Sequence, residues 1–267
     1  MRADRTATAA IVRGAAGTSG HVPDGPAFAN PLDATRQIRA ILFDLDGTLY
    51  AQGRMRRLMA LELLTLFATR PLSARRRLRA LSAYRKAQEA LRGSASTALM
   101  PRTQLDVAAA RAGVPAKELE ALVTEWMLER PLKYLPWCRA EGLAPLLSLL
   151  EAKRLPLGIL SDYPAEAKLR ALGVADHFSL VLCATDPEVA ALKPSPKGFL
   201  AACDRWQLAP HEVLFVGDRA EVDAAGAAAA GMPCVIVGHQ ARGGAGHPGV
   251  LFVPSLERLR CVLAEGC

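Results

Sequence analysis

Short apolar runs alternate with longer stretches of helical spacing from about residue 39 onward. Apolar runs with few polar interruptions are typical of strands that are covered on both faces of a parallel sheet. Strands are predicted at 40–45, 157–161, 179–183, 213–217 and 234–238, with a further strand at 250–253. Because helical patterns separate most of these runs, the sequence predicts an α/β fold with helices packed on a parallel sheet.

A long helical segment separates the first two predicted strands. Helices are predicted near 55–69, 74–92, 103–112 and 116–129. Residues that interrupt helices lie between or beside them, namely Pro71, Gly93, Pro101, Gly113 and Pro115. No strand-like alternation occurs in this segment, so we expect a helical insertion within the α/β domain.

Three parts of the chain follow from this pattern. Residues 1–38 are rich in Ala, Gly, Pro and Thr and lack periodicity, so we expect a flexible N-terminal tail. The core domain is predicted at 39–53 and 135–267, and the helical cap domain at 54–134.

Composition and charge narrow the class of protein. The chain has 267 residues, of which 51% are hydrophobic, and six scattered cysteines without a CxxC pair. Such cysteines are expected to be free thiols in the reducing cytoplasm, and no apolar stretch is long enough to predict a membrane span. The net charge of +7 is concentrated in the helical segment at 54–102. Because no nucleic-acid-binding motif accompanies it, we interpret this charge as the solvated face of amphipathic helices.

Two acidic residues follow the first predicted strand. Asp44 and Asp46 are two positions apart, which would place both carboxylates on one face if the strand continued. Two like charges about 4 Å apart repel by roughly 4 kcal/mol at an effective dielectric constant near 20. A cation is therefore expected beside them, or a proton on one carboxyl group.

Other polar residues follow the neighbouring strands. Ser161 ends the second strand, Lys193 follows the third, and Asp218 ends the fourth, with Asp223 five residues later. Because ligands bind beyond the carboxyl ends of parallel strands, these groups are expected to converge. Carboxylate oxygens suit Mg²⁺, and a lysine and a hydroxyl suit a phosphate group. This combination predicts phosphoryl transfer, in which one aspartate attacks phosphorus and its neighbour transfers a proton.

Four segments also carry a family resemblance. In chain order, "DLDGTL", "ILSD", "LKPSPKGF" and "VGDRAEVD" closely resemble the four motifs of the haloacid dehalogenase superfamily, over roughly residues 39–240. The resemblance is to its phosphatase type with a C1 helical cap, similar to the phosphoglycolate phosphatases. It implies a Rossmann-like parallel sheet core with the cap inserted after the first motif.

The resemblance also implies roles for individual residues. Asp44 would be the nucleophile that forms an aspartyl-phosphate, and Asp46 the general acid and base. Mg²⁺ would be held by Asp44, by the backbone carbonyl of Asp46, and by Asp218, with Asp223 in support.

Phosphate-binding roles fall on three further residues. Thr48, Ser161 and Lys193 would bind the transferring phosphoryl group, and Gly47 would allow the sharp turn beside the ligand. Dehalogenating members lack the second aspartate of the first motif, so the presence of Asp46 disfavours carbon–halogen cleavage. Arg219 stands where many relatives carry a small Ser or Thr.

The sequence therefore predicts a cytoplasmic, Mg²⁺-dependent phosphatase of a small phosphomonoester, with no nucleic-acid or membrane partner. A phosphomutase or other phosphotransferase of the same superfamily is the nearest alternative. Phosphonate cleavage would need a reactive lysine in the cap, where Lys86 and Lys117 are the evident candidates. A non-catalytic protein that binds a partner through the basic cap is an alternative of another class. The natural substrate and the oligomeric state remain open.

Overall fold

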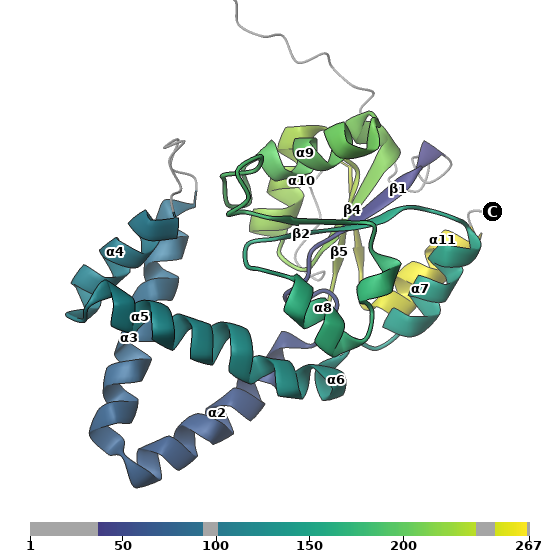
Figure 1. The fold of residues 1–267 in the computed structure, drawn as a ribbon. Helices are drawn as coiled ribbons and strands as arrows, with labels where there is room; N and C mark the ends of the chain where they lie inside the picture. Colours follow the sequence, from purple (N-terminus) through teal and green to yellow (C-terminus); the bar gives the residue numbers. More distant parts are fainter. Residues whose placement is uncertain (1–36, 93–100, 239–248, 266–267) are drawn as a thin grey trace, which may run out of the picture.

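The structure, a computed structural model, describes residues 37–92, 101–238 and 249–265 (Figure 1). The predicted N-terminal tail lies outside the described residues, except for its last two positions.

A six-stranded parallel sheet forms the centre of the fold, with strand order β3-β2-β1-β4-β5-β6. The strands are β1 (Ala40–Phe43), β2 (Leu157–Ser161), β3 (Leu180–Cys183), β4 (Val213–Gly217), β5 (Cys234–Val237) and β6 (Val250–Val253). Each lies within two residues of its predicted position. The predicted α/β fold with a parallel sheet is confirmed.

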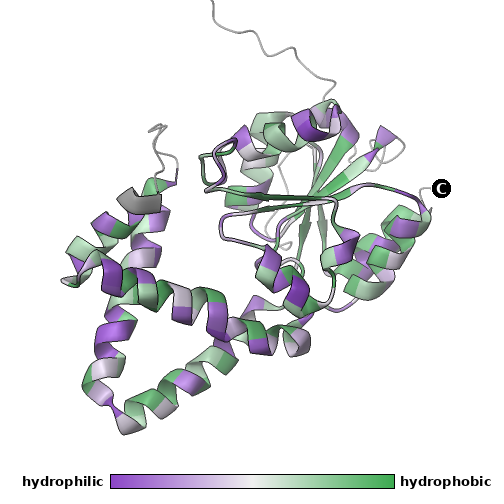
Figure 2. Ribbon diagram, viewed as in Figure 1, coloured by the Kyte–Doolittle hydropathy of each residue, from purple (hydrophilic) through white to green (hydrophobic). Residues whose placement is uncertain are grey.

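Helices cover both faces of this sheet (Figure 1). They are α7 (Leu143–Ala152), α8 (Glu166–Leu172), α9 (Lys197–Trp206), α10 (Ala225–Ala230) and α11 (Leu256–Glu265), with short turns η4 (Ala175–His177), η5 (Pro210–Glu212) and η6 (Ala220–Ala224). Alternate residues of β1 point to opposite faces. Ile41 and Phe43 pack with α7, α8 and α11, whereas Ala40 and Leu42 pack with α9 and α10. Both faces are thus buried, which explains why the strands are continuous apolar runs in Figure 2.

The strand order reverses at the centre of the sheet. From β1 the chain passes outward to β2 and β3, then returns to β4 on the other side of β1 and continues to β5 and β6. Such a reversal leaves a crevice beyond the carboxyl ends of the two central strands, where open α/β sheets bind ligands. Asp44 and Asp218 immediately follow β1 and β4, so the fold brings them to this crevice.

A group of helices lies between β1 and β2 in the sequence and extends to one side of the sheet (Figure 1). It comprises α2 (Gln52–Thr69), α3 (Pro71–Leu91), α4 (Pro101–Ala112), α5 (Ala116–Val123), η2 (Thr124–Glu129), η3 (Arg130–Tyr134) and α6 (Leu135–Cys138). Buried residues of α3, α4, α5 and η2 form an apolar cluster of their own, which includes Leu119 and Trp126. We refer to Gln52–Tyr134 as the cap helices. The predicted division of the chain into domains at 54 and 134 remains a prediction.

One predicted helix differs from the structure. The helix expected at 116–129 is α-helical only to Val123 and continues as the π-helix η2. The amide of Arg130 donates to the carbonyl of Glu125, five residues back, in place of the α-helical partner four residues back. Pro131 follows and has no amide hydrogen, so a regular α-helix could not continue through it without losing a hydrogen bond.

Within the described ranges, no helix is both long enough and apolar enough to cross a membrane. The five cysteines in these ranges are free, and four of them are buried.

Candidate active site

Asp44 and Asp46 follow β1 closely in the sequence but contact different groups. The strand ends at Phe43, so the alternation that would place the two carboxylates side by side does not extend to Asp46. Asp44 is buried and still aligned with β4, because its amide donates to the carbonyl of Val216 at 2.8 Å. Each carboxylate accepts hydrogen bonds from a different lysine. The sequence predicted a cation beside the two acids, and the structure shows a separate lysine for each of them.

Lys193 is the cation beside Asp44. Its Nζ lies 2.6 Å from Asp44 Oδ1 and 2.7 Å from Asp223 Oδ1, and its side chain is 5% exposed. Burial alone would lower the pKa of this ammonium group, but Asp223 and Asp44 together raise the pKa above its ordinary value. The backbone amide of Lys193 donates to Asp162 Oδ1 at 3.2 Å, which fixes the loop that carries it.

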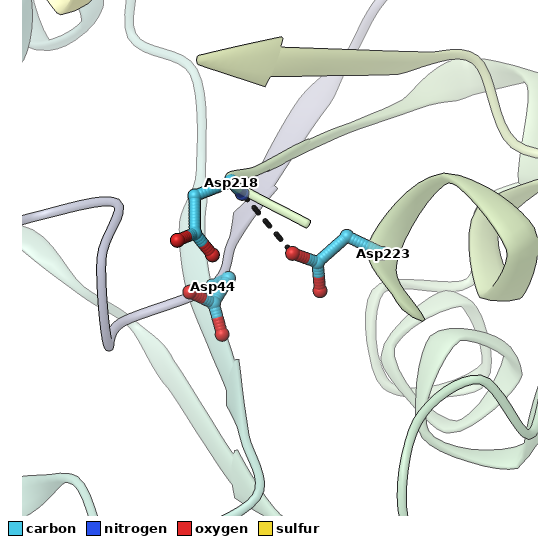
Figure 3. A group of neighbouring side chains, drawn as sticks. All are labelled: Asp44, Asp218 and Asp223. Atoms are coloured by element: carbon cyan, nitrogen blue, oxygen red, sulfur yellow. Dashed lines mark hydrogen bonds between the residues drawn. The ribbon is translucent and has the colours of Figure 1, made fainter. Parts of the chain in front are cut away.

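Three aspartates form an acidic cluster at the reversal point (Figure 3). Carboxylate oxygens of Asp44, Asp218 and Asp223 lie within 4.8 Å of one another. Burial and the neighbouring Asp223 raise the pKa of Asp218 to about 7. Burial also raises the pKa of Asp44, against the opposing effect of Lys193. Burial is thus the main cause of both shifts, and repulsion between neighbouring carboxylates adds to it, so both groups are easier to protonate than free aspartates.

The acids of the cluster differ in their capacity to bind a cation. Asp223 accepts from Lys193 and, through Oδ2, from the amides of Asp218 at 3.1 Å and Arg219 at 3.0 Å. Its oxygens are thus occupied by protein donors. Asp44 accepts one hydrogen bond on each oxygen, from Lys193 and from Thr48, so each of its oxygens keeps one acceptor direction for a cation. Asp218 would supply the second carboxylate. Hard carboxylate oxygens at this spacing fit a divalent ion such as Mg²⁺.

Gly47 is the turn that lets these acids approach. Its φ of +109° is in a region that L side chains rarely adopt, and a Cβ atom at this position would overlap the Asp218 carboxylate. The chain can therefore pass beside Asp218 only with glycine here.

The two predicted hydroxyl residues, Thr48 and Ser161, are both buried. Thr48 donates to Asp44 Oδ2 at 3.0 Å, so its single hydroxyl hydrogen holds the Asp44 carboxylate. Ser161 ends β2, and its Oγ accepts from the amide of Tyr163 at 3.2 Å, which leaves the hydroxyl hydrogen free to donate elsewhere. Contact of either residue with a phosphate group remains a prediction.

Asp46 is held by residues that the sequence did not single out. Lys168 Nζ lies 2.6 Å from Oδ1 and 2.8 Å from Oδ2 of Asp46, and the hydroxyl of Tyr50 donates to Oδ1 at 2.6 Å. Burial would raise the pKa of Asp46, but Lys168 and Tyr50 together lower it. One indication was available: Lys168 lies one turn from Ala165 and Leu172 on the apolar face of α8.

The C-terminal end of α3 contacts the core beside the site. Arg92 Nη1 lies 2.7 Å from Asp162 Oδ2 and donates to the carbonyl of Lys193 at 2.7 Å. No side chain caps α8, and Asp162 connects Arg92 to the Lys193 loop. Nearby, Tyr163 donates to Gln88.

A further contact involves the unusual residue of the fourth motif. Arg219 Nη1 lies 3.5 Å from an oxygen of Glu89, also on α3. The side chains of both residues are substantially exposed, so we assign little energy to this pair. It does bring the cap helices to the opposite side of the crevice from Asp162.

The family model for haloacid dehalogenase-like hydrolases matches residues 38–231, which is more than half of the chain. The chain belongs to this family. The family resemblance of the four motifs and the expectation of a hydrolase are thereby confirmed.

Curated relatives match part of the chain. The phosphoglycolate phosphatase of Escherichia coli (strain K12) is 40% identical over 95 residues, which are 34% of this chain and 36% of that protein. The matched region thus spans about a third of the length of that relative. The N-acetylmuramic acid 6-phosphate phosphatase of Pseudomonas putida is 37% identical over 81 residues, 29% of this chain and 35% of that protein.

A solved structure matches more of the chain. The phosphatase of this family from Thermococcus onnurineus is 25% identical, with a TM-score of 0.59 over 85% of this chain and 98% of that one. The likeness extends to most of both chains.

Proposed function

We propose that this protein is a Mg²⁺-dependent phosphatase of a small phosphomonoester, with Asp44 as the nucleophile. The observation that carries the proposal is the pairing of Asp44 with Lys193 within the acidic cluster, at the reversal point of the sheet. An attacking carboxylate, a fixed ammonium group and a cation site are the parts that phosphoryl transfer requires.

Mg²⁺ would be held by the carboxylates of Asp44 and Asp218 and by the backbone carbonyl of Asp46. When bound, it would compensate charge on the acidic cluster and on the phosphoryl oxygens. The raised pKa values of Asp44 and Asp218 arise mainly from burial and in part from repulsion by neighbouring carboxylates, and a bound cation would offset both effects. Asp223 would hold Lys193 in place through the 2.7 Å contact between their side chains.

In the first half-reaction, an Asp44 oxygen attacks phosphorus and forms an acyl-phosphate bond. The bond from phosphorus to the ester oxygen breaks, and protonated Asp46 gives its proton to that oxygen, which leaves as an alcohol. In the second half-reaction, Asp46 as carboxylate takes a proton from water, which attacks phosphorus and releases inorganic phosphate from Asp44. Lys193 and Ser161 would bind the phosphoryl oxygens throughout.

The lowered pKa of Asp46 suits its role as base in the second half-reaction. Its role as acid requires a higher pKa when substrate is bound. A phosphate dianion beside Asp46 supplies this change, because a nearby like charge disfavours the ionised form.

The names of the curated relatives and the presence of Asp46 support a phosphatase over other activities of the family. The names of the curated relatives are those of phosphatases of phosphoglycolate and of N-acetylmuramic acid 6-phosphate. The family also includes dehalogenases, such as the 2-haloacid dehalogenase of Pseudomonas syringae, which is 26% identical with a TM-score of 0.58 over 86% of this chain and 100% of that one. The presence of Asp46, with a set of its own hydrogen-bond donors, favours phosphoryl transfer.

Phosphate release from 4-nitrophenyl phosphate tests the proposal directly. Wild type with Mg²⁺ is expected to turn over, and both a chelator and Asp44→Asn are expected to reduce turnover to the background rate. Arg79→Met, on an exposed side of α3, serves as a matched control that should retain activity. If Asp44→Asn turned over substrate at the wild-type rate, the aspartyl-phosphate route would be contradicted. A panel of phosphoglycolate, sugar phosphates, nucleotides and pyrophosphate would then identify the substrate, and sugar acceptors would reveal a phosphotransferase.

A further inference from the structure

Lys168 is a buried cation with no role in the motifs of the family. Its side chain is 6% exposed, although it belongs to the short helix α8. The same helix face already carries Leu169 and Leu172, which are almost completely buried in the core. Packing of α8 against the core therefore does not require a charged side chain at position 168, and an apolar one would be sufficient. Burying an ammonium group instead costs several kcal/mol of desolvation unless it is paired and hydrogen-bonded.

Among the described residues, Lys168 forms an ion pair only with Asp46. Its Nζ donates to both carboxylate oxygens, at 2.6 and 2.8 Å. Tyr50, four residues after Asp46, donates to Oδ1 at 2.6 Å. Tyr50 is itself 5% exposed and packs in the apolar cluster that contains Phe43. Both donors are thus held by the core.

These contacts restrict the Asp46 carboxylate to one orientation. A carboxylate offers about four acceptor directions, two on each oxygen. Lys168 and Tyr50 occupy both directions on Oδ1, and Lys168 occupies one on Oδ2. One direction on Oδ2 is left for a proton. General acid and base catalysis depends on such alignment between the carboxyl oxygen and the reacting oxygen.

We propose that Lys168 is a positioning residue, which together with Tyr50 orients Asp46 so that Oδ2 exchanges the proton with the leaving oxygen and with water. This inference rests on the proposed phosphatase function. It assigns a catalytic consequence to a residue outside the four motifs, located 122 positions from its partner in the sequence.

Two substrates of nearly the same shape separate positioning from a structural role. Phenyl phosphate has a poor leaving group that needs protonation, whereas 4-nitrophenyl phosphate has a good leaving group that needs it less. Values of kcat/KM report the steps up to the first irreversible one, which includes departure of the leaving group. A residue that only stabilises the fold would change both values by the same factor.

Lys168→Met is expected to lower kcat/KM about 100-fold for phenyl phosphate and about 10-fold or less for 4-nitrophenyl phosphate, within the range known for general acid catalysis. Lys168→Arg keeps donors for both oxygens and should recover part of the loss. Tyr50→Phe keeps the ring and removes one donor, so it should show a smaller loss with the same preference. Arg170→Met, an exposed substitution on α8, is the control and should change neither value.

Equal losses for the two substrates in Lys168→Met would overturn the inference, as would full activity. If Lys168→Met does not fold, Tyr50→Phe decides by the same criterion. Absence of turnover in the wild type would refute the proposed function instead. Turnover in the wild type with equal losses in the variants would refute only the role of Lys168.

Discussion

Replacement of Lys193 by methionine tests whether this side chain compensates buried charge. The Nζ of Lys193 contacts Asp44 and Asp223 at 2.6 and 2.7 Å, and the three side chains are 5%, 8% and 2% exposed, respectively. Methionine has similar length and suits a buried site, so the main change is loss of the ammonium group. Two buried carboxylates then lose their common partner.

Removal of one partner of a buried ion pair typically costs about 3–5 kcal/mol. The raised pKa of Asp44 allows this carboxyl to take up a proton in the variant, which relieves part of the cost. We therefore expect Lys193→Met to lower the free energy of unfolding by about 3 kcal/mol in chelator, the lower end of that range. Because the ammonium group also repels a divalent cation, the variant should bind Mg²⁺ more tightly than wild type, and linkage should reduce its deficit in Mg²⁺.

Urea denaturation of both proteins, in EDTA and in excess Mg²⁺, measures these differences, provided that the slopes agree. Lys117→Met is the control, since Lys117 is exposed and such changes usually alter stability by less than about 0.5 kcal/mol. A deficit below about 1 kcal/mol in EDTA would refute charge compensation by Lys193. A deficit that Mg²⁺ leaves unchanged would refute the assignment of the cation to this acidic cluster.

Three further predictions concern the cap, the turn and acid stability. Arg92→Met removes hydrogen bonds to a carboxylate and a carbonyl, each worth up to about 1.5–3 kcal/mol, and should lower kcat/KM about 10-fold or more. Arg79→Met, on α3, is the control and should leave kcat/KM unchanged. Equal kcat/KM values for the two variants would contradict a role of Arg92 in cap contact. Gly47→Ala should weaken Mg²⁺ binding, measured by calorimetry, because its Cβ would displace the Asp218 carboxylate; unchanged affinity would contradict this. Glu62 on α2 contacts Arg130, Lys133 and Tyr134. Burial opposes ionisation of Glu62, but these three partners lower its pKa from 4.5 to about 2, so the stabilisation is present above about pH 4.5 and lost as pH falls through about 2. Glu62→Gln should thus be less stable than wild type at pH 6 but equal near pH 2, and a gap independent of pH would contradict the assignment.

The sequence predicted the sheet and most of the polar groups beside it because both depend on local patterns. Buried parallel strands must be apolar on both faces, so their positions appear directly as apolar runs. The residues that follow such strands reach a common edge whatever the details of packing. Asp44, Ser161 and Asp218 were located in this way, and the structure brings them to the crevice at the centre of the sheet.

The contacts that the sequence did not predict join segments far apart in the chain. Lys168 is 122 positions from Asp46, and Arg92 lies 101 positions from the Lys193 carbonyl that it contacts. A lysine in a short helix and an arginine at a helix end are common on solvated surfaces, so neither residue type predicts burial. Only the packing of α8 and α3 against the core determines their partners.

The two aspartates of the first motif acquire different chemistry through these distant partners. Burial raises the pKa of both, but neighbouring carboxylates add to this effect at Asp44, whereas Lys168 and Tyr50 reverse it at Asp46. Pairs of acids whose environments separate their pKa values can take different roles in one reaction. At Asp44 a divalent cation would offset the burial of the carboxylate and the repulsion from its neighbours, whereas the oriented, ionised base is at Asp46. The repulsion expected between Asp44 and Asp46 is thus relieved by separate cations. This separation allows one residue to bond to phosphorus while the other transfers protons.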